Sequence, residues 1–471
     1  MKIVFIVRDP VPSYGIMSIS AFVKKAGHQC EIIFAHPRQD IVKDVKKRNA
    51  HIVAFSCTSG RHLWAMKVGR ALKQALGVMT IIGGPHATFF PDIINDAAFD
   101  VVCVGEGEEA ILELMNNLQQ KKPINDIANL WVKQGDQIYK NPVRPLIQDL
   151  NSLPAPDREI YMDVPYIREY QRDTFIFMTG RGCPYNCSYC YNKAAKTLYR
   201  GKGRFVRRMH PEKAIAELKE MHARYRLNGI IFEDDTFTIN LEWLQEFLEL
   251  YRKDVNVPFI CNSRGDTMSA EMARMLADAG CRGVKLGVEA GNEEIRINIL
   301  KKTVTNEQFI QAARHLKQAG LKIQCFNILG IPGGNLDKDY ETLSFNTLLK
   351  ADHAWCSIMN PYPQTEIREI ALEKGLLDAN QTAEDFFRES YFVDTALNLP
   401  DKRKVVNLHH FFGIAARFPF LQPLIKVIIN LPFTNLYEYI FKLDHINALR
   451  RFYHIRTMTW LRFLWHCRGI Y

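Results

Sequence analysis

The sequence lacks a long uninterrupted hydrophobic run. Its first ten residues, MKIVFIVRDP, hold an apolar run of only five residues, which an arginine and an aspartate follow. We therefore expect a first β-strand there instead of a signal peptide. Low-complexity segments are also missing, and no internal repeat is visible beyond an alternation of strands and helices. With no expected export signal, we place the protein in the cytoplasm.

The composition is that of an ordinary globular protein. The 471 residues are enough for two or three domains, with 47% hydrophobic and 24% charged residues. In a reducing cytoplasm disulfides are rare, so the 11 cysteines should be thiols. Thiols that cluster in such a protein favour a metal site.

Acidic residues are scarce at the C-terminal end of the chain. The net charge of +10 comes from 61 basic and 51 acidic residues. From Lys402 onward there are eleven Lys and Arg but only Glu438 and Asp444, so this tail carries +9 and the first 401 residues carry +1. A near-neutral body argues against a broad nucleic-acid surface, which should be basic.

The first part of the chain alternates short apolar runs with helical stretches. The apolar runs, which we interpret as buried strands, are 2–7, 30–35, 52–57, 79–84 and 100–105. Such alternation predicts a parallel, doubly wound Rossmann-like sheet, over residues 1–135. Ligands of such sheets bind at the carboxyl ends of the strands.

A Pro-rich stretch without periodicity, 136–174, predicts a linker. A second alternation then covers 175–365, with strands expected at 174–180, 229–234, 258–263, 282–289, 322–330 and 353–360. Six β/α units predict a partial barrel, with functional residues on the loops that follow its strands. The last part, 366–471, has no such pattern, and we expect a mainly helical region.

Three cysteines stand close together in GRGCPYNCSYCYN (180–192), and no fourth follows them. Cys183, Cys187 and Cys190 have the spacing C-x3-C-x2-C, which suits one compact loop around a metal centre. A structural zinc site normally takes four ligands, and a [4Fe–4S] cluster is usually held by four thiolates. Three thiolates leave one iron open to another ligand.

This motif, with the aromatic Tyr189 before its last cysteine, resembles the signature of the radical S-adenosylmethionine (SAM) enzymes. The resemblance implies a [4Fe–4S] cluster on the three cysteines, with SAM chelating the open iron. It implies that the reduced cluster cleaves SAM to a 5′-deoxyadenosyl radical that takes hydrogen from a substrate. An electron donor such as flavodoxin or ferredoxin would be a partner. The implied fold is a partial (β/α)6 barrel, as the strand pattern predicts.

Further residues follow the expected barrel strands in the order that this resemblance implies for SAM contacts. Glu233, Asp234 and Asp235 come after the second strand, where acidic residues receive the SAM ammonium. Arg264 follows the third strand and would pair with the SAM carboxylate. Glu289 follows the fourth strand and would bind the ribose hydroxyls.

A glycine-rich turn follows the fifth barrel strand, in ILGIPGG (328–334). Its Gly330 would allow close approach of the adenine. Cys356 and His353, at the sixth strand, could donate hydrogen or a proton to the product, although core packing explains them at least as well. The sequence assigns no other catalytic residue.

Small residues also end the third, fourth and fifth strands of the first domain, in the order S-x-T, GGPH and VGEGE. This order resembles cobalamin (B12)-binding domains fused to radical SAM barrels, and 149–158 resembles the linker between them. The resemblance thus spans about 1–365. The residues that it assigns to cobalamin are Ser56, Thr58, Gly83, Gly84, His86, Gly105, Glu106 and Gly107.

The first domain departs from the resemblance at one position. The motif D-x-H-x-x-G, whose histidine ligates cobalt, is missing from RDPVPSYG (8–15). We therefore expect cobalt without a protein imidazole. His62 could approach the lower face instead, but a surface or helix-start histidine is the simpler interpretation. A Rossmann-like domain that has lost its ligand is the alternative, whereas no G-x-G-x-x-G supports a dinucleotide site.

The resemblance implies a cobalamin-dependent radical SAM enzyme, and we expect a C-methyltransferase acting on an unactivated carbon. A cyclase or rearrangement enzyme, like the cyclase of anaerobic chlorophyll synthesis, is one alternative. A methylthiotransferase is another, with Cys30, Cys57 and Cys103 holding a second cluster, although only Cys57 stands at a strand end. A non-enzymatic corrinoid or iron–sulfur sensor is a third.

The basic tail bears on the substrate. Aromatic residues alternate with its arginines and lysines: Phe418, Phe420, Phe433, Tyr437, Tyr439, Phe441, Phe452, Trp460, Phe463 and Trp465. This mixture favours the surface of an anionic membrane, and prolines and charges make 411–433 a poor spanning helix. We expect either peripheral contact with the inner membrane face, and a lipid-like or other apolar small-molecule substrate, or a helical cap over the barrel.

Overall fold

The computed structural model describes residues 1–36, 39–378 and 394–467. The chain forms two compact units. The first contains 1–169, 197–204 and 461–471, and the second contains 170–196 and 205–460. Two stretches of the expected C-terminal region, 379–393 and 468–471, lie outside the described residues.

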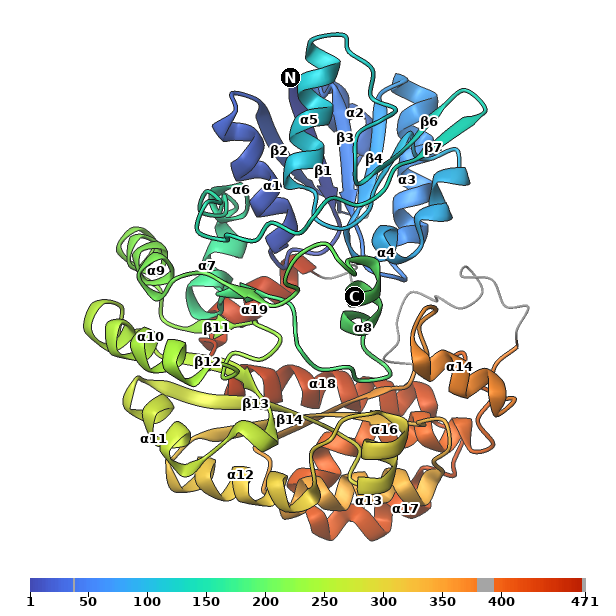
Figure 1. The fold of residues 1–471 in the computed structure, drawn as a ribbon. Coiled ribbons are helices and arrows are strands. Elements are labelled where there is room, and N and C mark those ends of the chain that lie inside the picture. Colours follow the sequence, from blue (N-terminus) through green and yellow to red (C-terminus); the bar gives the residue numbers. More distant parts are fainter. Residues whose placement is uncertain (37–38, 379–393, 468–471) are drawn as a thin grey trace. The chain divides into compact units, whose positions relative to one another are not determined.

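The first unit is built on a seven-stranded sheet with the order β2-β1-β3-β4-β5-β6-β7 (Figure 1). Its strands are β1 (Lys2–Val7), β2 (Gln29–Phe34), β3 (Ile52–Ser56), β4 (Met79–Gly83), β5 (Val101–Cys103), β6 (Leu130–Gln134) and β7 (Gln137–Lys140). The first five strands are parallel, and β6 and β7 join as an antiparallel hairpin.

Helices cover both faces of this sheet, as in a doubly wound fold. They are α1 (Tyr14–Lys25), α2 (Ile41–Lys47), α3 (His62–Leu76), α4 (Gly84–Phe89) and α5 (Glu108–Gln119), with the short η1 (Pro91–Asn95). Helix α1 packs beside α5, and α2 packs beside α3. Because both faces are covered, the central strands are apolar along their whole length, which gave the sequence its apolar runs.

The expected linker contains regular structure. Strand β7, α6 (Glu159–Met162) and α7 (Pro165–Asp173) all fall within 136–174. The β6–β7 hairpin extends the sheet by pairing β6 antiparallel to β5. Its strands are short and partly polar, because an edge hairpin has one face toward water, so no long apolar run marked them.

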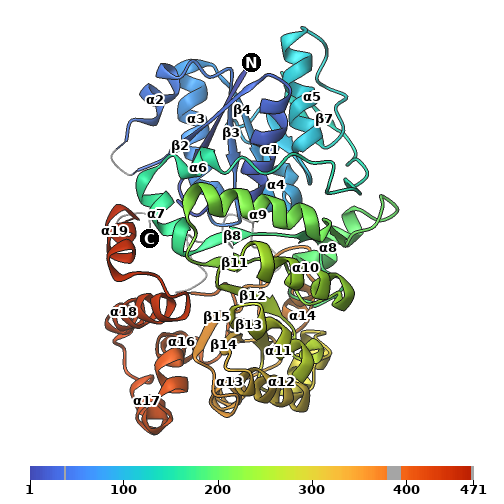
Figure 2. The ribbon, with the colours of Figure 1, turned by 90° about the vertical axis from the view of Figure 1, so that its left-hand side faces the viewer.

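The second unit holds a six-stranded, fully parallel sheet with the order β15-β14-β13-β12-β11-β8 (Figure 2). Its strands are β8 (Phe175–Phe177), β11 (Ile230–Phe232), β12 (Phe259–Ser263), β13 (Cys281–Glu289), β14 (Lys322–Leu329) and β15 (His353–Ile358). A small ribbon of β9 (Gly180–Arg181) and β10 (Arg207–Arg208) stands apart. The predicted partial (β/α)6 architecture is confirmed.

Helices follow the barrel strands. They are α8 (Tyr191–Leu198), α9 (Pro211–Tyr225), α10 (Leu241–Asp254), α11 (Ala270–Asp278), α12 (Asn306–Gln318) and α13 (Leu336–Leu348), with η2 (Gly265–Thr267) and the π-helical turn η3 (Ile295–Ile299). Side chains cap several of these helices, including Asn240, Ser269 and Asn335. Each such cap stabilises a helix start by about 1 kcal/mol and fixes where the loop after a strand ends.

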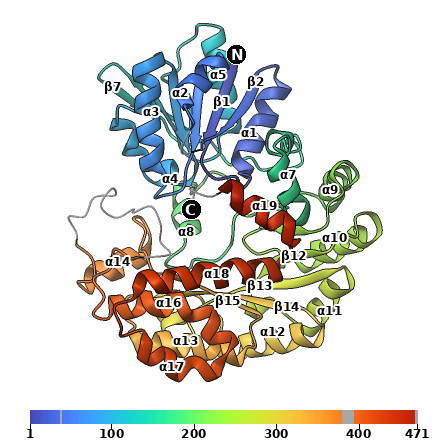
Figure 3. The same ribbon diagram turned by 180° about the vertical axis from the view of Figure 1, so that it is seen from behind.

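The described C-terminal region is helical, as expected. It contains α14 (Glu366–Glu373), α16 (Lys402–Arg417), η4 (Pro419–Leu421), α17 (Gln422–Ile428), α18 (Thr434–Phe452) and α19 (Thr457–Cys467). Helix α16 packs against β15 and α18 against α16 (Figure 3). Phe411 and Phe412 of α16 are buried in the resulting core. None of the helices that the structure describes has the length and apolar character needed to cross a membrane.

Candidate functional site

The three motif cysteines lie together on the loop between β9 and α8. Cys187 is buried, and Cys183 and Cys190 are half-buried. Burial, with a smaller contribution from the neighbouring Cys187 and Cys183, raises the pKa of Cys190 to about 11. Burial likewise raises the pKa of Cys183, with Asp235 and Cys187 adding to the effect. The three thiols thus stand on one short, partly buried loop.

The donor set of this loop fits an iron–sulfur cluster. Within the described ranges, no group of three His, Cys, Asp or Glu side chains is arranged to hold one metal ion. A cluster makes a different demand, because each thiolate binds its own iron and the sulfur atoms need not converge on one point. Three thiols around a loop, without a fourth, meet that demand and leave one iron open.

Contacts with other elements fix the cysteine loop. Lys196 of α8 donates hydrogen bonds to the carbonyl oxygens of Pro184 (2.8 Å) and Tyr185 (2.6 Å) and to Oδ1 of Asn186 (2.6 Å). Ser188 donates from its hydroxyl to the Ile299 carbonyl at 2.6 Å. A cation over loop carbonyls makes charge-assisted bonds, so Lys196 holds the loop in its curved shape.

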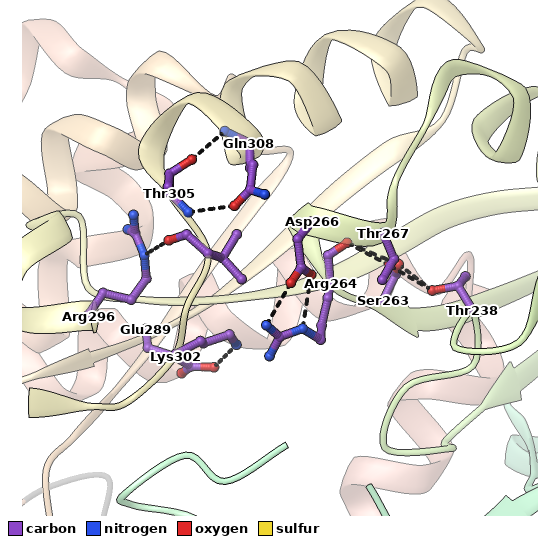
Figure 4. A network of polar contacts seen from close by, with 11 residues as sticks. Thr238, Ser263, Arg264, Asp266, Thr267, Glu289, Arg296, Lys302, Thr305 and Gln308 are labelled. Atoms are coloured by element: carbon purple, nitrogen blue, oxygen red, sulfur yellow. Dashed lines mark hydrogen bonds and ion pairs between the residues drawn. The ribbon is translucent and has the colours of Figure 1, made fainter. Parts of the chain in front are cut away.

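Arg264, expected to meet the SAM carboxylate, is fixed at the end of β12 (Figure 4). Asp266 accepts from its Nε at 3.0 Å and from Nη2 at 2.9 Å. The guanidinium lies 3.4 Å from the ring centre of Tyr185, a cation–π contact with the cysteine loop. The arginine is therefore positioned next to the loop before any ligand binds.

Glu289, expected to bind the ribose, has a rare backbone conformation at the end of β13. Its φ is +66°, a region that residues other than glycine seldom adopt, and the β13–β14 register shifts here. Lys302 donates to its Oε1 at 3.0 Å, and both side chains are nearly buried (Figure 4). A Cβ on Gly287 would stand 2.3 Å from that oxygen, so only glycine leaves room for the pair.

Two neighbouring acidic residues after β11 have different surroundings. Glu233 accepts from Lys285 Nζ at 2.7 Å, and Lys285 is buried within β13. Asp234 is buried and accepts from the backbone N–H and the hydroxyl of Thr179. The Asp234 carboxylate thus joins β11 to the end of β8, whereas the Glu233 carboxylate is only partly buried, in reach of a ligand.

Tyr189 and Gly330 occupy two further expected SAM positions. Burial raises the pKa of Tyr189 well above its usual value, and a hydrogen bond to Glu289 adds to this effect. Gly330 has a φ of +68°, and its N–H donates to Oδ1 of Asp339 at 3.0 Å. Tyr189, Glu289 and Lys302 therefore form one group, and Gly330 stands on a separate turn after β14.

The expected cobalamin residues of the first unit lie at one edge of its sheet. Ser56 ends β3, Gly83 ends β4, and Gly105 follows β5, on strands that pair side by side. Thr58 is exposed just beyond β3. Gly84 has a φ of +86°, and a Cβ there would stand 2.9 Å from the backbone nitrogen of Cys57. Glycine at this position thus lets two backbone segments meet closely at the strand ends, the edge where doubly wound sheets bind their ligands.

His86 and His62 stack on each other, with ring centres 3.8 Å apart. Both are buried, and the burial lowers the pKa of His62 to about 4 and that of His86 to about 3. His86 also shares a hydrogen bond with the Ser59 hydroxyl at 3.0 Å. His62 is the first residue of α3, as expected, but it is a packed residue and not a surface one.

The turn after β5 is held by a residue from another part of the chain. The Glu106 N–H donates to the Tyr199 hydroxyl at 2.9 Å, and the Ile147 N–H donates to Glu106 Oε2 at 3.0 Å. A Cβ on Gly105 would stand 1.8 Å from the Tyr199 hydroxyl oxygen, and one on Gly107 would stand 3.0 Å from Ile19. These glycines are needed for close packing as well as for any ligand.

The weak catalytic candidates on β15 have structural roles. Cys356 is buried against α16, with its Sγ 3.9 Å from the His409 carbonyl oxygen. His353 shares a hydrogen bond with Gln324 at 2.9 Å and is buried. Since they are three residues apart on a strand, they point to opposite faces and cannot act as a pair. Core packing, the alternative interpretation, accounts for both.

A second cluster on Cys30, Cys57 and Cys103 does not fit this fold. Cys30 lies on β2 and Cys103 on β5, with three strands between them. At about 4.8 Å per strand their strands are about 19 Å apart. Burial raises the pKa values of all three thiols, to about 11, 12 and 12. These are separate core residues, as expected for Cys30 and Cys103.

Several residues around the sites were not expected from the sequence. Lys285 and Tyr199 act through contacts with residues 52 and 93 positions away, and Lys302 and Lys196 through residues 13 and 12 positions away. Lysines and tyrosines are common, and no motif includes them. Tyr185 lies within the cysteine motif, and this position was the one signal in the sequence that pointed to a role for it at the site.

Two family models match the chain. The Radical SAM superfamily matches residues 177–345, and the B12 binding domain matches residues 3–115. An uncharacterized methyltransferase of Pyrococcus horikoshii, PH0819, is 30% identical over 378 residues, which are 78% of this chain and 80% of that protein. The anaerobic magnesium-protoporphyrin IX monomethyl ester cyclase of Synechocystis sp. is 23% identical over 399 residues, 80% of this chain and 77% of the cyclase.

A solved structure has the same arrangement of elements. The cobalamin-dependent S-adenosylmethionine radical enzyme OxsB, with aqua-cobalamin and S-adenosylmethionine bound, matches with a TM-score of 0.69. The match covers 95% of this chain and 71% of OxsB at 16% identity. At this identity the likeness supports the fold and not a shared substrate.

Proposed function

The chain belongs to the radical SAM enzymes that carry an N-terminal B12 binding domain, and from this we propose that it is a C-methyltransferase acting on an unactivated carbon of an apolar, lipid-like substrate. When bound, a [4Fe–4S] cluster with SAM supplies a radical that removes hydrogen, and cobalamin supplies the methyl group. One observation carries the proposal: a single chain contains two candidate cofactor sites with different groups to bind a ligand. One is a three-thiol loop, and the other is a glycine-lined sheet edge.

The residues of the second unit would bind and orient SAM. Cys183, Cys187 and Cys190 would hold the cluster. Arg264 is already fixed beside their loop and would pair with the SAM carboxylate. Glu289, held by Lys302, would accept from the ribose hydroxyls.

The first unit would hold the corrin. Ser56, Gly84 and Gly105 lie at or beside the carboxyl ends of adjacent strands, where doubly wound sheets bind ligands. The stacked His86 and His62 are packed and uncharged, because burial holds both pKa values well below neutrality.

Apolar side chains exposed on the C-terminal helices support an apolar substrate. We propose that the enzyme works at the inner membrane face, where such molecules collect. The cyclase relative is named for a tetrapyrrole ester, so cyclisation is the second candidate for this chain. Methylthiolation is not proposed, because two of the three additional thiols, Cys30 and Cys103, stand on strands that three other strands separate.

Two measurements test the proposal: the cofactor content of the enzyme, and then the fate of SAM, which separates the candidate reactions. The holoenzyme is purified anaerobically from cells supplied with cobalamin, and its iron, sulfide and corrinoid contents are measured. We expect one cluster and one corrinoid per chain. A triple variant, C183A/C187A/C190A, should lose the iron, whereas C281A, a buried thiol outside the loop, should keep it.

With SAM, a reductant and apolar substrates, methylation consumes two SAM molecules for each product. We therefore expect S-adenosylhomocysteine and 5′-deoxyadenosine in equal amounts, together with a product that carries the labelled methyl group. 5′-Deoxyadenosine without S-adenosylhomocysteine would favour the cyclase or rearrangement reaction. A chain without corrinoid would overturn the proposal.

A further inference from the structure

Exposed apolar side chains concentrate in one stretch of the second unit. Sixteen large hydrophobic residues are exposed in the described part of the chain, and nine of them lie within residues 418–443. These nine, which we call the apolar face, are Phe418, Phe420, Leu424, Val427, Leu431, Phe433, Leu436, Tyr439 and Leu443. Phe420 is 76% exposed and Val427 is 64% exposed, so neither is held by the fold.

Helix α17 divides its side chains between the core and the apolar face. Ile425 and Ile429, four residues apart, are buried at 3% and 0% exposure in the core that α16 forms with β15. Leu424 and Val427, three residues apart, point the other way. A surface helix of a globular protein normally carries polar residues on its outer side. Helix α17 is apolar on both sides.

The first half of α18 continues the apolar face. Leu436, Tyr439 and Leu443 are spaced by three and four residues, so they form one stripe along the helix, and all three are exposed. Tyr437, between them, is buried, and its hydroxyl donates to the Ile428 carbonyl at 3.0 Å. This hydrogen bond joins α18 to the end of α17, so the two stripes lie on helices that contact each other.

Two basic residues beside the apolar face, Arg403 and Lys426, form no ion pair with a carboxylate of the described residues. Residues 401–444 contain six Lys and Arg and three acidic residues. Four of the six cations are in ion pairs: Lys402 with Asp394, Lys404 with Asp401, Arg417 with Asp444, and Lys442 with Glu438. Arg403 donates to the Asn430 carbonyl at 3.2 Å, at the end of α17, and Lys426 lies on α17 itself, 4.7 Å from the ring centre of Tyr340. The surface is therefore apolar with a positive rim.

We propose that this apolar face docks on the surface of an anionic lipid bilayer, with Phe420, Leu424 and Val427 inserted among the lipid chains and Arg403 and Lys426 at the headgroups. The inference deepens the proposed action on an apolar substrate and rests on it. Apolar residues with a cationic rim match the two layers of a bilayer surface. A second copy of the chain is a poorer fit, because it would bring the same positive rim against this one.

Burial also shows which residues of the C-terminal region are unavailable for docking on a bilayer. Tyr437, Phe452, Trp460 and Phe463 are buried, so they belong to the fold. Removal of everything after Asp401 would uncover the core that Phe411 and Phe412 fill, and loss of folding would then be mistaken for loss of docking. Substitutions of exposed residues in the full chain avoid this problem.

The test is co-sedimentation of the anaerobically purified full-length holoenzyme with vesicles of phosphatidylcholine and phosphatidylglycerol. The test variant is L424D/V427D. The matched control is V206D/L241D, which introduces the same charges at two exposed apolar positions of the same unit. We expect partitioning of the test variant to fall by at least about tenfold, because burying one such side chain is worth about a factor of ten or more. The control should bind like the unmodified enzyme.

A charge variant tests the rim separately. R403Q/K426Q should bind anionic vesicles less tightly while its weak binding to pure phosphatidylcholine vesicles stays unchanged. Equal binding of L424D/V427D and the unmodified enzyme would overturn the proposal, and so would no binding of the unmodified enzyme to anionic vesicles. Dimerisation that L424D/V427D abolishes would identify the face as an interface between copies and also overturn it.

SAM cleavage is measured in the same samples without vesicles. Its loss in every protein would count against the proposed function, and vesicle binding would still report on the docking face. If SAM cleavage is unchanged but the enzyme does not bind vesicles, then the docking proposal is rejected and the proposed function is not.

Discussion

The Glu289–Lys302 pair shows how one residue contact can fix a ligand-binding group. Lys302 donates to Glu289 at 3.0 Å, and both side chains are at most 10% exposed. The backbone of Glu289 is strained at a φ of +66°, and strain of this kind persists where surrounding contacts enforce it. The ion pair is such a contact, so Lys302 is a positioning residue for the expected ribose ligand.

Removing Lys302 should leave the buried Glu289 carboxylate without its ion pair. We expect K302M to lower the free energy of unfolding by about 3 kcal/mol, because breaking a buried pair costs more than replacing both partners. K302M/E289Q should recover most of this loss, since no buried charge is left. Urea denaturation of the four proteins of this cycle measures the coupling. Equal stability of K302M and the unmodified protein would show that Glu289 is stabilised by other groups.

Asp339 adds a pH-dependent residue behind the Gly330 turn. Burial raises its pKa from 3.8 to about 7, although the Gly330 N–H donates to it. Between pH 4 and 7 the folded protein therefore holds a proton that the unfolded chain releases. The contribution of Asp339 to stability is fully present below pH 4 and is lost as the pH rises to 7.

The variant D339N keeps an acceptor for Gly330 but cannot ionise. Its melting temperature should rise relative to that of the unmodified protein as the pH increases from 4 to 7, and the difference should level off above 7. D337N, at an exposed position of the same helix, is the control and should show no such trend. A difference that does not change with pH would mean that Asp339 is ionised throughout this range.

At the scale of elements, a histidine cluster joins the C-terminal helices to the barrel. His409 and His410 of α16 and His445 of α18 pack around Phe441, with ring centres 4.7–5.9 Å from its own. His353 of β15 lies against His445, with ring centres 5.9 Å apart. Burial lowers the pKa values of His409, His410, His445 and His353 to about 3, 4, 4 and 3, in that order. The charged groups that face them are Arg417, Asp444, Glu438, Lys442 and Arg451.

Because these histidines are neutral in the fold, the docking of α16 and α18 should be acid-sensitive. The unfolded chain takes up their protons below pH 6.5 and the folded chain only near 3 to 4, so stability is lost as the pH falls through this range. We expect H409F to lose less stability as the pH falls, because phenylalanine takes up no proton. The substitution breaks no hydrogen bond of the ring, since neither ring nitrogen of His409 has a partner in the structure. The control H51Q alters an exposed histidine. Melting curves from pH 7 to 4 measure the slopes, and parallel slopes for all three proteins would contradict this account.

The elements differ in how far the sequence predicts them. All eleven parallel strands of the two sheets lie within or beside the expected apolar runs, because strands buried on both faces must be apolar. Helix α4 and the β6–β7 hairpin were not expected, since they are short and partly polar. The cysteine loop could be predicted, because its residues are close together in the sequence. The roles of Lys302 and Tyr199 could not be predicted, because only the three-dimensional fold brings them to their partners.

At the scale of the whole molecule, the chain passes between its two units four times. One of the shared elements is α8, which begins directly after the cysteine loop and ends in the first unit. Residues 197–204 belong to that unit and are tied to it. The Leu146 N–H donates to the Lys202 carbonyl at 2.9 Å, and the Glu106 N–H donates to Tyr199. A single helix thus connects the loop of one cofactor to the strand-end turn of the other.

The variant G105A tests this connection. Its Cβ would stand 1.8 Å from the Tyr199 hydroxyl oxygen, so the tyrosine must leave the turn. We expect faster amide exchange in 197–204 and weaker retention of corrinoid, while the iron content stays that of the unmodified enzyme. G27A is the matched control, because Gly27 has nearly the same φ, +84° against +83°, but no atom within 4 Å of the added Cβ.

Comparison of the two variants separates backbone strain from the lost contact. Strain at a positive φ is shared by both, so G27A reports its effect on stability alone. Y199F removes the hydroxyl that accepts from Glu106 and leaves the ring in place, and its effect should be smaller than that of G105A. If G105A and G27A retain corrinoid equally well, then the contact of Tyr199 with the β5 turn does not support the corrinoid site. α8 would then be a covalent connection without a role in that site.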